Sequence, residues 1–382
     1  MKKGEKAYRK LKKQGLSDKE IAESYVLPSD LTKKEKKEAD KEFSGFLKVY
    51  REMKNGKYCQ YNYLQSSINW LKKYEVSLDI PYRYLCEDHR FYHNWDHIED
   101  LLEQIDKKGL ENNEILFLAT IFHDIVYDPK FTDNEEKSAE LFMKSCKADR
   151  KLKQAVKRII LDTKTHKPSN EISKIFCEMD MAILKRPLDK LIEYENKIFK
   201  EFQCYDWLLY KKGRIGVLRQ LQEGKELEPL ISYIESRQPK IAIYAGSFQP
   251  FHRGHANILE KAEQIFDKVI IARGKNPDKN LDVYPLPDSI KFRQIELYDG
   301  LLTDFIKGLG YDVTVIRGLR NATDLQYELT QYRFLQDLDK NIKVISIFCD
   351  KDYDHVSSSA IRQLIKLNKP NSNYKLENQY LP

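Results

Sequence analysis

The sequence predicts a multidomain protein in which an all-α domain is followed by an α/β domain with a parallel sheet. Its 382 residues are enough for two or three domains. From about residue 62 to 236 the pattern is helical, with few glycines and no alternating apolar runs. After a polar linker, strand-like and helical runs alternate, which is typical of right-handed βαβ units. We therefore expect three parts, with the boundaries 1–60, 61–236 and 240–382.

The elements of the C-terminal part follow from its apolar runs. Strands are expected at residues 241–245, 268–272, 312–316 and 342–348. Helices are expected at residues 255–266, 288–298, 300–308, 322–339 and 358–367. In a parallel α/β sheet, ligands bind beyond the carboxyl ends of the strands. The segments that leave these strands are therefore the first places to look for a site.

The net charge of +7 comes from the N-terminal part alone. Residues 1–60 contain 17 Lys and Arg against 10 Asp and Glu, whereas the remainder contains 49 of each. We expect a basic helical extension that packs on the protein. The piece "KKQGLSDKEIAES" resembles the start of a helix-turn-helix, so contact with nucleic acid stays open, although Pro28 interrupts the recognition helix. Scattered cysteines, no long apolar run and no signal-peptide pattern indicate a cytoplasmic protein with reduced thiols and no membrane association.

The stretch "GSFQPFHRGH", Gly246 to His255, leaves the first predicted strand and enters a helix. Glycines here allow the backbone to approach a phosphate closely. His252 and His255 can donate hydrogen bonds to phosphate oxygens, and a helix N-terminus favours negative charge. Because no covalent nucleophile with an adjacent base is present, the pattern indicates direct transfer between two bound substrates.

Three further motifs follow later strands in order. "NPDKN" offers Lys279 to a phosphate, and "VIRGLRNATDLQYE" offers Arg317, Arg320 and Glu328. "HVSSSAIR" places serines at a helix start, where hydroxyl and amide groups can hold a triphosphate. The ordered set points to a nucleotide-phosphate site more strongly than the histidine turn alone.

These four motifs resemble the phosphopantetheine adenylyltransferases, nucleotidyltransferases with an (H/T)xGH turn, over residues 240–367. The resemblance implies a Rossmann-like domain that transfers the adenylyl group of ATP, with Mg²⁺, to 4'-phosphopantetheine, giving dephospho-coenzyme A and pyrophosphate. It implies catalytic roles for His255, His252, Lys279 and Arg320. The nucleotide site it implies comprises Ser247, Phe248, His255, Gly318, Leu319, Arg320, Glu328 and the run from Tyr353 through Ser357, Ser358 and Ser359. The positions that match the acceptor site are Ser247, Lys279, Leu302 and Arg317.

One position departs from this family. The first residue of the xxGH turn is His252, where the family usually has Thr and where many nicotinamide- and glycerol-phosphate-type relatives have His. A nicotinamide-mononucleotide adenylyltransferase is therefore the alternative. The motif "IRGLRNATDLQYE" favours phosphopantetheine.

The middle part contains a second cluster of chemically active residues. His93 and His97 are four apart, which predicts one helical face. His123 and Asp124 are adjacent in "FLATIFHDIV", which is expected to be an otherwise apolar helix. A buried His–Asp pair is costly unless something compensates for it, and a bound metal needs neutral imidazole and ionised carboxylate. Four such groups in two clusters indicate a metal site.

This part resembles the HD-superfamily metal-dependent phosphohydrolases of the "YHNxxH…FHDxVYD…NEExSA" type, over about residues 64–225. The resemblance implies His97, His123, Asp124 and Asp180 as metal ligands, with Mn, Fe, Mg, Co or Zn as the metal. It implies His93 as the general acid and allows His166 as an extra ligand of a second metal. No role is predicted for Glu135 or Glu136.

The sequence as a whole therefore predicts a bifunctional enzyme that binds ATP and an acceptor phosphate at one site and hydrolyses a nucleotide-like substrate at the other. The alternative is a nucleotide sensor that binds without turnover through one or both sites. Resemblance to the adenylyltransferases also implies association into homo-oligomers.

Overall fold

The computed structural model describes residues 70–77, 79–275, 285–370 and 374. The basic extension predicted at residues 1–60 and the predicted acceptor-site residue Lys279 lie outside the described residues. The chain folds into two compact units. Among the described residues, the helical unit comprises those up to Asp128 together with Asp133–Asp180, and the sheet unit comprises Pro129–Thr132 and those from Met181 onward.

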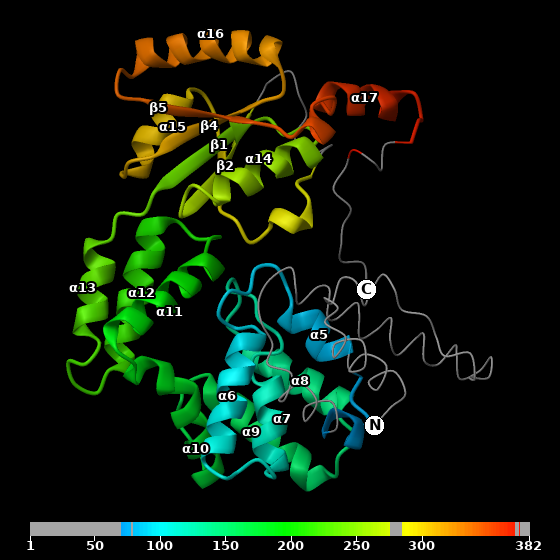
Figure 1. Ribbon diagram of the computed structural model, residues 1–382, viewed down its shortest axis with the longest axis vertical. Helices are drawn as coiled ribbons and strands as arrows, with labels where there is room; N and C mark the ends of the chain where they lie inside the picture. Colours follow the sequence, from blue (N-terminus) through cyan, green and yellow to red (C-terminus); the bar gives the residue numbers. More distant parts are fainter. Residues whose placement is uncertain (1–69, 78, 276–284, 371–373, 375–382) are drawn as a thin grey trace, which may run out of the picture. The chain divides into compact units, whose positions relative to one another are not determined.

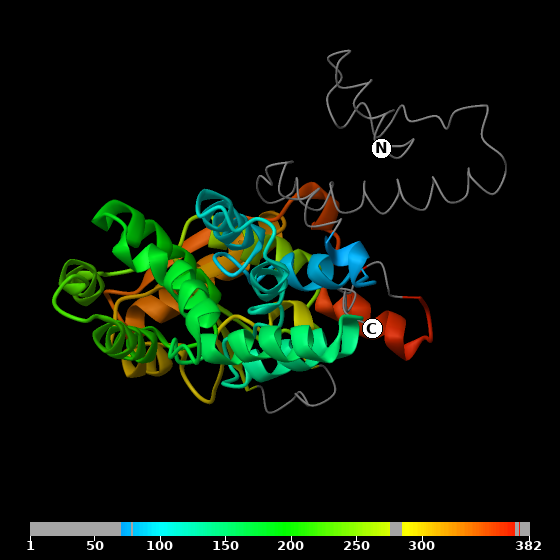
Figure 2. The same ribbon diagram turned by 90° about the horizontal axis from the view of Figure 1, so that it is seen from below.

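The helical unit packs its helices around one apolar core. They are α5 (Asp79–Leu85), α6 (Trp95–Lys107), α7 (Glu114–Phe122), α8 (Asn134–Ser145), α9 (Arg150–Thr163) and α10 (Glu171–Asp180). Both views show α6 to α9 lying against one another (Figures 1 and 2). Phe122, Phe142 and Phe176 are fully buried where these helices meet. The all-α architecture predicted for this part agrees with these elements.

Local sequence explains where the two central helices begin and how they pack. Asn94 caps α6 and Asn113 caps α7, each accepting a hydrogen bond from the backbone of the first turn. The α6 helix buries residues at helical spacing, from Ile98 to Ile105, and leaves its other face polar. The α7 helix instead buries every residue from Leu116 to Phe122. It is therefore the central helix, and it delivers the residues that follow it into the core.

The sheet unit contains a five-stranded parallel sheet in the order β3-β2-β1-β4-β5. The strands are β1 (Ile241–Gly246), β2 (Lys268–Gly274), β3 (Ile295–Tyr298), β4 (Thr314–Leu319) and β5 (Lys343–Phe348). The helices between and after them are α14 (Arg253–Glu263), α15 (Leu302–Leu309), α16 (Ala322–Leu338) and α17 (Ser358–Lys366). Among the described residues, none of the helices is both long enough and apolar enough to span a bilayer.

The strand order reverses beside β1. The chain runs from β1 outward to β2 and β3, then returns to the other side of β1 as β4, so the order reverses between β1 and β4. Figure 1 shows α14 on one side of the sheet and α16 on the other. Ile258 of α14 packs with Ile316 of β4, while Glu328 of α16 reaches the next residue, Arg317, on the opposite face. The predicted doubly covered parallel sheet is thus observed.

Three more helices belong to the sheet unit, namely α11 (Leu188–Glu201), α12 (Trp207–Leu221) and α13 (Glu228–Ser236). The turn between α11 and α12 is held by Lys268, at the start of β2. Its Nζ donates hydrogen bonds to the carbonyl oxygens of Gln203 (2.6 Å) and Tyr205 (2.9 Å). The hydroxyl of Tyr311 donates to Asp206 in the same turn. The all-α domain was predicted to extend to residue 236, whereas these contacts group residues 181–236 with the sheet.

One predicted element is wrong. Residues 288–298 were expected to be a helix, but only Asp288–Ile290 forms a short 3₁₀ turn, and Ile295–Tyr298 is the edge strand β3. Ile271 of β2 and Ile295 lie opposite each other in parallel register. The stretch satisfies a helical apolar spacing as well as a strand alternation, and pairing with β2 decides between them.

Candidate functional site

The turn between β1 and α14 carries two histidines that cap the helix together. The backbone N–H of His255 donates to Nδ1 of His252 (3.4 Å), and the backbone N–H of His252 donates to Nδ1 of His255 (3.2 Å). This is a capping box with imidazoles in place of the usual Ser and Glu. Because each Nδ1 accepts a hydrogen bond, each neutral ring carries its proton on Nε2. The turn therefore presents two Nε2–H donors.

The surroundings keep both imidazoles neutral. Burial lowers the pKa of His252 to about 4, and the charge of Arg320 adds to this effect. Burial also lowers the pKa of His255 well below its usual value, with His252 and Arg320 as further causes. The two rings stack with centroids 3.7 Å apart and planes 21° apart, an approach that two imidazolium ions would oppose. Positive potential at this turn comes from Arg320 and from the start of α14.

Two glycines of this turn make room for rings of the turn itself. A Cβ on Gly254 would lie 3.2 Å from the ring of His252. A Cβ on Gly246 would lie 3.0 Å from the ring of Phe248, whose own backbone is left-handed with a φ of 49°. Close approach was predicted at both glycines with a phosphate as the neighbour. The close neighbours in the structure are side chains of the turn.

Two arginines, Arg317 within β4 and Arg320 just after it, are paired with carboxylates of α16. Arg320 makes a two-pronged pair with Asp324, from Nε to Oδ2 (2.7 Å) and from Nη2 to Oδ1 (2.8 Å). Arg317 places Nε 3.3 Å from Oε2 of Glu328 and donates from Nη1 to the carbonyl oxygen of Ala245. Arg317 was predicted to hold the acceptor and Glu328 the nucleotide. The structure pairs these two residues with each other.

The other predicted residues of the sheet unit lie around the same carboxyl edge. Ser357 caps α17, and Ser358 donates to the carbonyl oxygen of Pro250, which ties α17 to the β1–α14 turn. Ser359 accepts a hydrogen bond from Arg362. The rest are Ser247 and Phe248 in the turn, Gly318 and Leu319 at the end of β4, and the buried Leu302 at the start of α15.

Three residues that hold the site together were missed by the sequence analysis. Arg273, buried at the end of β2, donates to the carbonyl oxygen of Ser247 (3.2 Å), and Arg362 donates to that of Gln249 (2.5 Å). The third is Asp324, the partner of Arg320 described above. A charged residue ending the apolar run "KVIIARG" is the signal by which Arg273 was detectable.

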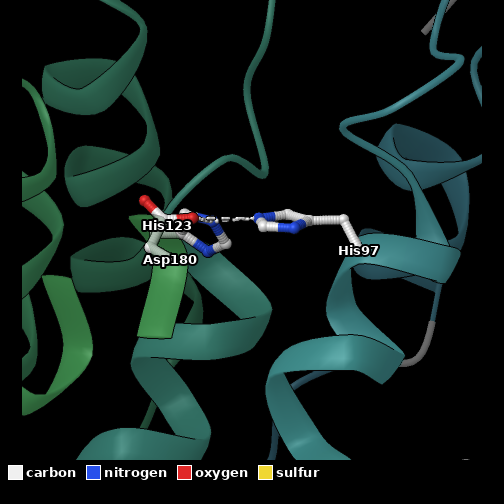
Figure 3. Close-up of side chains that lie close together, drawn as sticks. All are labelled: His97, His123 and Asp180. Carbon is white, nitrogen blue, oxygen red and sulfur yellow. Dashed lines mark hydrogen bonds and ion pairs between the residues drawn. The ribbon is translucent and has the colours of Figure 1, made fainter. Parts of the chain in front are cut away.

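The helical unit brings three of its predicted metal ligands to one point (Figure 3). The Nε2 atom of His97, from α6, lies 3.1 Å from Nε2 of His123 and 3.2 Å from Oδ1 of Asp180. The latter oxygen lies 3.7 Å from Nε2 of His123. Two ring nitrogens that face each other beside a carboxylate can share at most one proton, whereas a divalent cation satisfies all three. The donor set therefore fits a cation.

Asp124 and His93 lie beside this group on non-helical backbone. Oδ2 of Asp124 is 3.1 Å from Nε2 of His123 and 3.9 Å from Nε2 of His93. Two local predictions are corrected here. Because Asn94 caps α6, His93 precedes that helix and does not share a helical face with His97. Likewise α7 ends at Phe122, so His123 is its C-cap and Asp124 lies in the turn beyond it.

The electrostatics of this group are those of ionised carboxylates among imidazoles. Burial lowers the pKa of His123, but Asp124 and Asp180 more than offset this and raise it to about 9. Burial raises the pKa of Asp124, but His123 and then His93 outweigh burial and lower it. In the same way, hydrogen bonds from His166 and His97 outweigh burial and hold the pKa of Asp180 well below its usual range. A buried pair of carboxylates that stays ionised favours a positive partner.

Comparison with known proteins concerns the C-terminal part. A family model described as cytidylyltransferase-like matches residues 243–364. The phosphopantetheine adenylyltransferase of Mycoplasma capricolum is 41% identical over 135 residues, which cover 33% of this chain and 96% of that protein. That of Geotalea daltonii is 33% identical over 141 residues, covering 34% of this chain and 86% of that protein.

A solved structure, the bifunctional NMN adenylyltransferase/ADP ribose pyrophosphatase of Francisella tularensis with AMP and manganese, is also similar to part of the chain. The match covers 37% of this chain and 46% of that one, at 17% identity and a TM-score of 0.26. Such a score carries no argument for either unit. The two sequence relatives are informative, because this chain aligns with nearly their whole length at 33% identity or more. Through its C-terminal part the chain belongs to the phosphopantetheine adenylyltransferase family.

Proposed function

We propose that the sheet unit transfers the adenylyl group of ATP to 4'-phosphopantetheine, giving dephospho-coenzyme A and pyrophosphate. Both relatives described above are phosphopantetheine adenylyltransferases, and the chain covers 96% and 86% of their lengths, which supports this acceptor. The observation that carries the proposal is the reciprocal cap of His252 and His255, which fixes two uncharged N–H donors at the start of a helix. These donors lie at the carboxyl end of β1, where the strand order reverses.

The chemistry we assign to this turn is charge stabilisation. The acceptor phosphate attacks the α-phosphorus of ATP, a new P–O bond forms, and the bond to the pyrophosphate breaks. The two Nε2–H groups, the N-terminus of α14 and Arg320 stabilise the charge that builds up on the phosphoryl oxygens. Mg²⁺, when bound with ATP, neutralises part of the triphosphate charge. Ser357, Ser358 and Ser359 at the start of α17 complete the nucleotide site in this proposal.

For the acceptor we propose Arg317 and Lys279 as phosphate ligands, with Ser247 and Leu302 as the other residues of the acceptor site. Arg317 supports this role because its guanidinium is only weakly engaged, 3.3 Å from Glu328 and 3.3 Å from the carbonyl oxygen of Ala245. An arriving phosphate offers it a stronger, two-pronged partner. Nicotinamide mononucleotide remains the second candidate acceptor, on the single observation that His252 occupies the first position of the xxGH turn.

One experiment separates these acceptors. The full chain is incubated with ATP, Mg²⁺ and either 4'-phosphopantetheine or nicotinamide mononucleotide, and pyrophosphate release is followed. We expect release with phosphopantetheine and little with the mononucleotide. The reverse preference contradicts the acceptor but not the chemistry. Release with neither acceptor, while ATP still binds, favours the sensor alternative.

We further infer that the helical unit is an HD-type metal-dependent phosphohydrolase. His97, His123 and Asp180 would hold a divalent cation, with Asp124 completing the set, and the choice among Mn, Fe, Mg, Co and Zn stays open because imidazole and carboxylate suit several of them. The cation, when bound, supplies an acidified water as the nucleophile. In this proposal His93 delivers a proton to the leaving group. Asp124, 3.9 Å from its Nε2, and Tyr127, which stacks on its ring, orient the imidazole.

The test for this unit is phosphate release from a panel of nucleotides and pyrophosphate-linked compounds, with Mn²⁺ added to metal-free protein. Turnover that requires the cation and is lost in His123→Ala supports a hydrolase. Cation binding without turnover of any compound favours the sensor alternative. Self-association, which the resemblance implies, remains a proposal that a molar mass measurement of the chain in solution tests.

A further inference from the structure

The loop between α9 and α10, residues 164–170, is tied to both helices by one carboxylate. Oδ2 of Asp162, in the last turn of α9, accepts hydrogen bonds from the backbone N–H of Ser169 (3.0 Å) and from its Oγ (2.6 Å). The same oxygen accepts from Oγ of Ser173, a buried residue of α10 (2.6 Å). Three bonds on one oxygen join the end of α9, the loop and the start of α10. The conformation of the loop is therefore held by contacts with both helices.

His166 sits in this loop with a left-handed backbone. Its φ is 50°, a region that residues with a side chain rarely adopt. Such a conformation persists only where the surrounding structure holds it, and it is found disproportionately at functional sites. The imidazole is 26% exposed, and its Nε2–H donates to Oδ2 of Asp180 at 3.0 Å. His166 thus adopts an unfavourable backbone conformation in which its Nε2–H donates to the carboxylate of Asp180.

The two oxygens of Asp180 face different partners. Oδ1 lies 3.2 Å from Nε2 of His97 and 3.7 Å from Nε2 of His123. Oδ2 is the oxygen that His166 holds. One oxygen is therefore aimed at the two histidines, while the other is engaged from the opposite side of the carboxylate.

We propose that His166 is a positioning residue of the cation site in the helical unit: its Nε2–H holds Oδ2 of Asp180 so that Oδ1 alone ligates a divalent cation between His97 and His123. This inference rests on the proposed metal-dependent hydrolase. A hydrogen bond to the outer oxygen restricts rotation of the carboxylate and orients the inner oxygen before the cation arrives. Groups that orient metal ligands in this way typically change metal affinity about 10–100-fold when removed.

A direct ligand role for His166, in a second cation site, is the competing explanation. Two observations favour positioning. Among the described residues, the set whose ligand atoms lie within 4.8 Å of one another is His97, His123 and Asp180, without His166. The Nε2 of His166 is also committed to a carboxylate oxygen at hydrogen-bond distance. If His166 positions Asp180, the helical unit should bind one cation per chain. A side chain that donates a hydrogen bond but is a poor metal ligand should then be able to substitute for His166.

The experiment titrates Mn²⁺ alone into the metal-free full chain, without nucleotide, and measures stoichiometry and Kd from the free Mn²⁺ signal in electron paramagnetic resonance. The proteins are the wild type, His166→Ala, His166→Gln and the control Lys167→Ala, an exposed neighbour on the same loop. Asp180→Asn identifies which binding belongs to this site. Circular dichroism and thermal melting establish that each variant is folded.

We expect one site-specific Mn²⁺ in the wild type and in Lys167→Ala, with equal Kd. His166→Ala should raise Kd about 10–100-fold, and His166→Gln should recover most of the affinity because its amide N–H can donate to Oδ2. Equal affinity in His166→Ala and wild type overturns the inference and leaves the hydrolase proposal standing. Two ions in the wild type and one in both His166 variants makes His166 a ligand, which also overturns it. A wild type that binds no Mn²⁺ contradicts the hydrolase proposal itself, and this inference with it.

Discussion

His252 and His255 fix each other's tautomer. Each backbone N–H donates to the Nδ1 atom of the other residue, so both Nε2–H groups stay available while the rings stack 3.7 Å apart. A pair of uncharged donors needs no proton transfer and no rearrangement before a phosphate binds. This arrangement suits a site that stabilises developing charge on oxygen, and it sets the first two predictions.

His255→Ala removes one Nε2–H donor and half of the helix cap. We expect adenylyl transfer to fall about 10²–10³-fold, the usual effect of losing one donor to a developing oxyanion, with a smaller loss of ATP affinity. Single-turnover pyrophosphate release and ATP binding measured on the same protein separate the two effects. Lys167→Ala, at an exposed residue of the helical unit, is the control and should transfer at the wild-type rate. Unchanged turnover in His255→Ala removes this residue from the mechanism.

Because His252 and His255 are neutral, both the stability of the fold and the transfer rate should depend on pH in a specific way. Their folded-state pKa values are lowered, to about 4 for His252, so both rings stay neutral as pH falls through the ordinary histidine range near 6.5. The unfolded chain takes up these protons first, so the pair's contribution to stability is complete above pH 6.5 and is lost as pH falls toward 4. Transfer rates should therefore show no inflection near pH 6.5 attributable to the pair.

Histidine ring proton signals followed by NMR between pH 4 and 8 give an independent measurement. The two signals lost in the His252→Asn and His255→Asn variants identify the pair. Titration of either ring near pH 6.5 contradicts the assignment of buried, neutral donors.

Arg317→Lys keeps the charge but loses the planar fork. If Arg317 holds the acceptor phosphate through two parallel N–H bonds, KM for 4'-phosphopantetheine should rise at least about tenfold, because Lys is a point charge at a site built for a fork. KM for ATP should change little. Arg219→Lys, an exposed residue of α12 paired with Glu235, is the matched control. Equal effects on both substrates would place Arg317 in the packing of β4 against α16 instead.

Asp124→Asn keeps the shape of the side chain and removes its charge. We expect less bound Mn²⁺ and loss of any cation-dependent phosphohydrolysis, because Asp124 is the carboxylate nearest to Nε2 of His123, at 3.1 Å. Adenylyl transfer belongs to the other unit, with its own core, and should be unchanged. Elemental analysis of the purified proteins, with both activities assayed in parallel, measures all three quantities. A folded variant that loses both activities would show that the units are coupled.

Lys268→Met tests the packing of the α11–α12 turn on the sheet. The substitution keeps much of the buried volume but leaves the carbonyl oxygens of Gln203 and Tyr205 without their donor. Each buried acceptor left unsatisfied costs about 1–3 kcal/mol, so the melting temperature should fall by several degrees. Lys261→Met, a half-exposed lysine paired with Asp350, is the comparison and should cost much less. Equal melting temperatures would mean that water or another donor replaces Nζ.

The sequence alone was sufficient for features that depend on local pattern. Short apolar runs separated by helical stretches predicted four of the five strands and a parallel sheet, because burial on both faces imposes near-continuous apolar strands. The start of α17 followed from the run of serines in "HVSSSAIR", and Ser357 caps this helix in the structure. The ordered motifs placed His252, His255, Arg317 and Arg320 after strands, and all four lie at the carboxyl edge of the sheet.

Tertiary structure decided whatever depends on which elements become neighbours. Residues 295–298 form a strand because β2 leaves an edge for them to pair with, although their spacing also fits a helix. The helices at 188–236 join the sheet through Lys268, an interaction between residues more than 60 positions apart, which periodicity cannot encode. Arg317 meets Glu328, and His166 meets Asp180, because packing brings separate elements together after their local structure is set. Local propensity acts within a few residues, whereas hydrogen bonds and ion pairs between elements exist only once the whole core has formed.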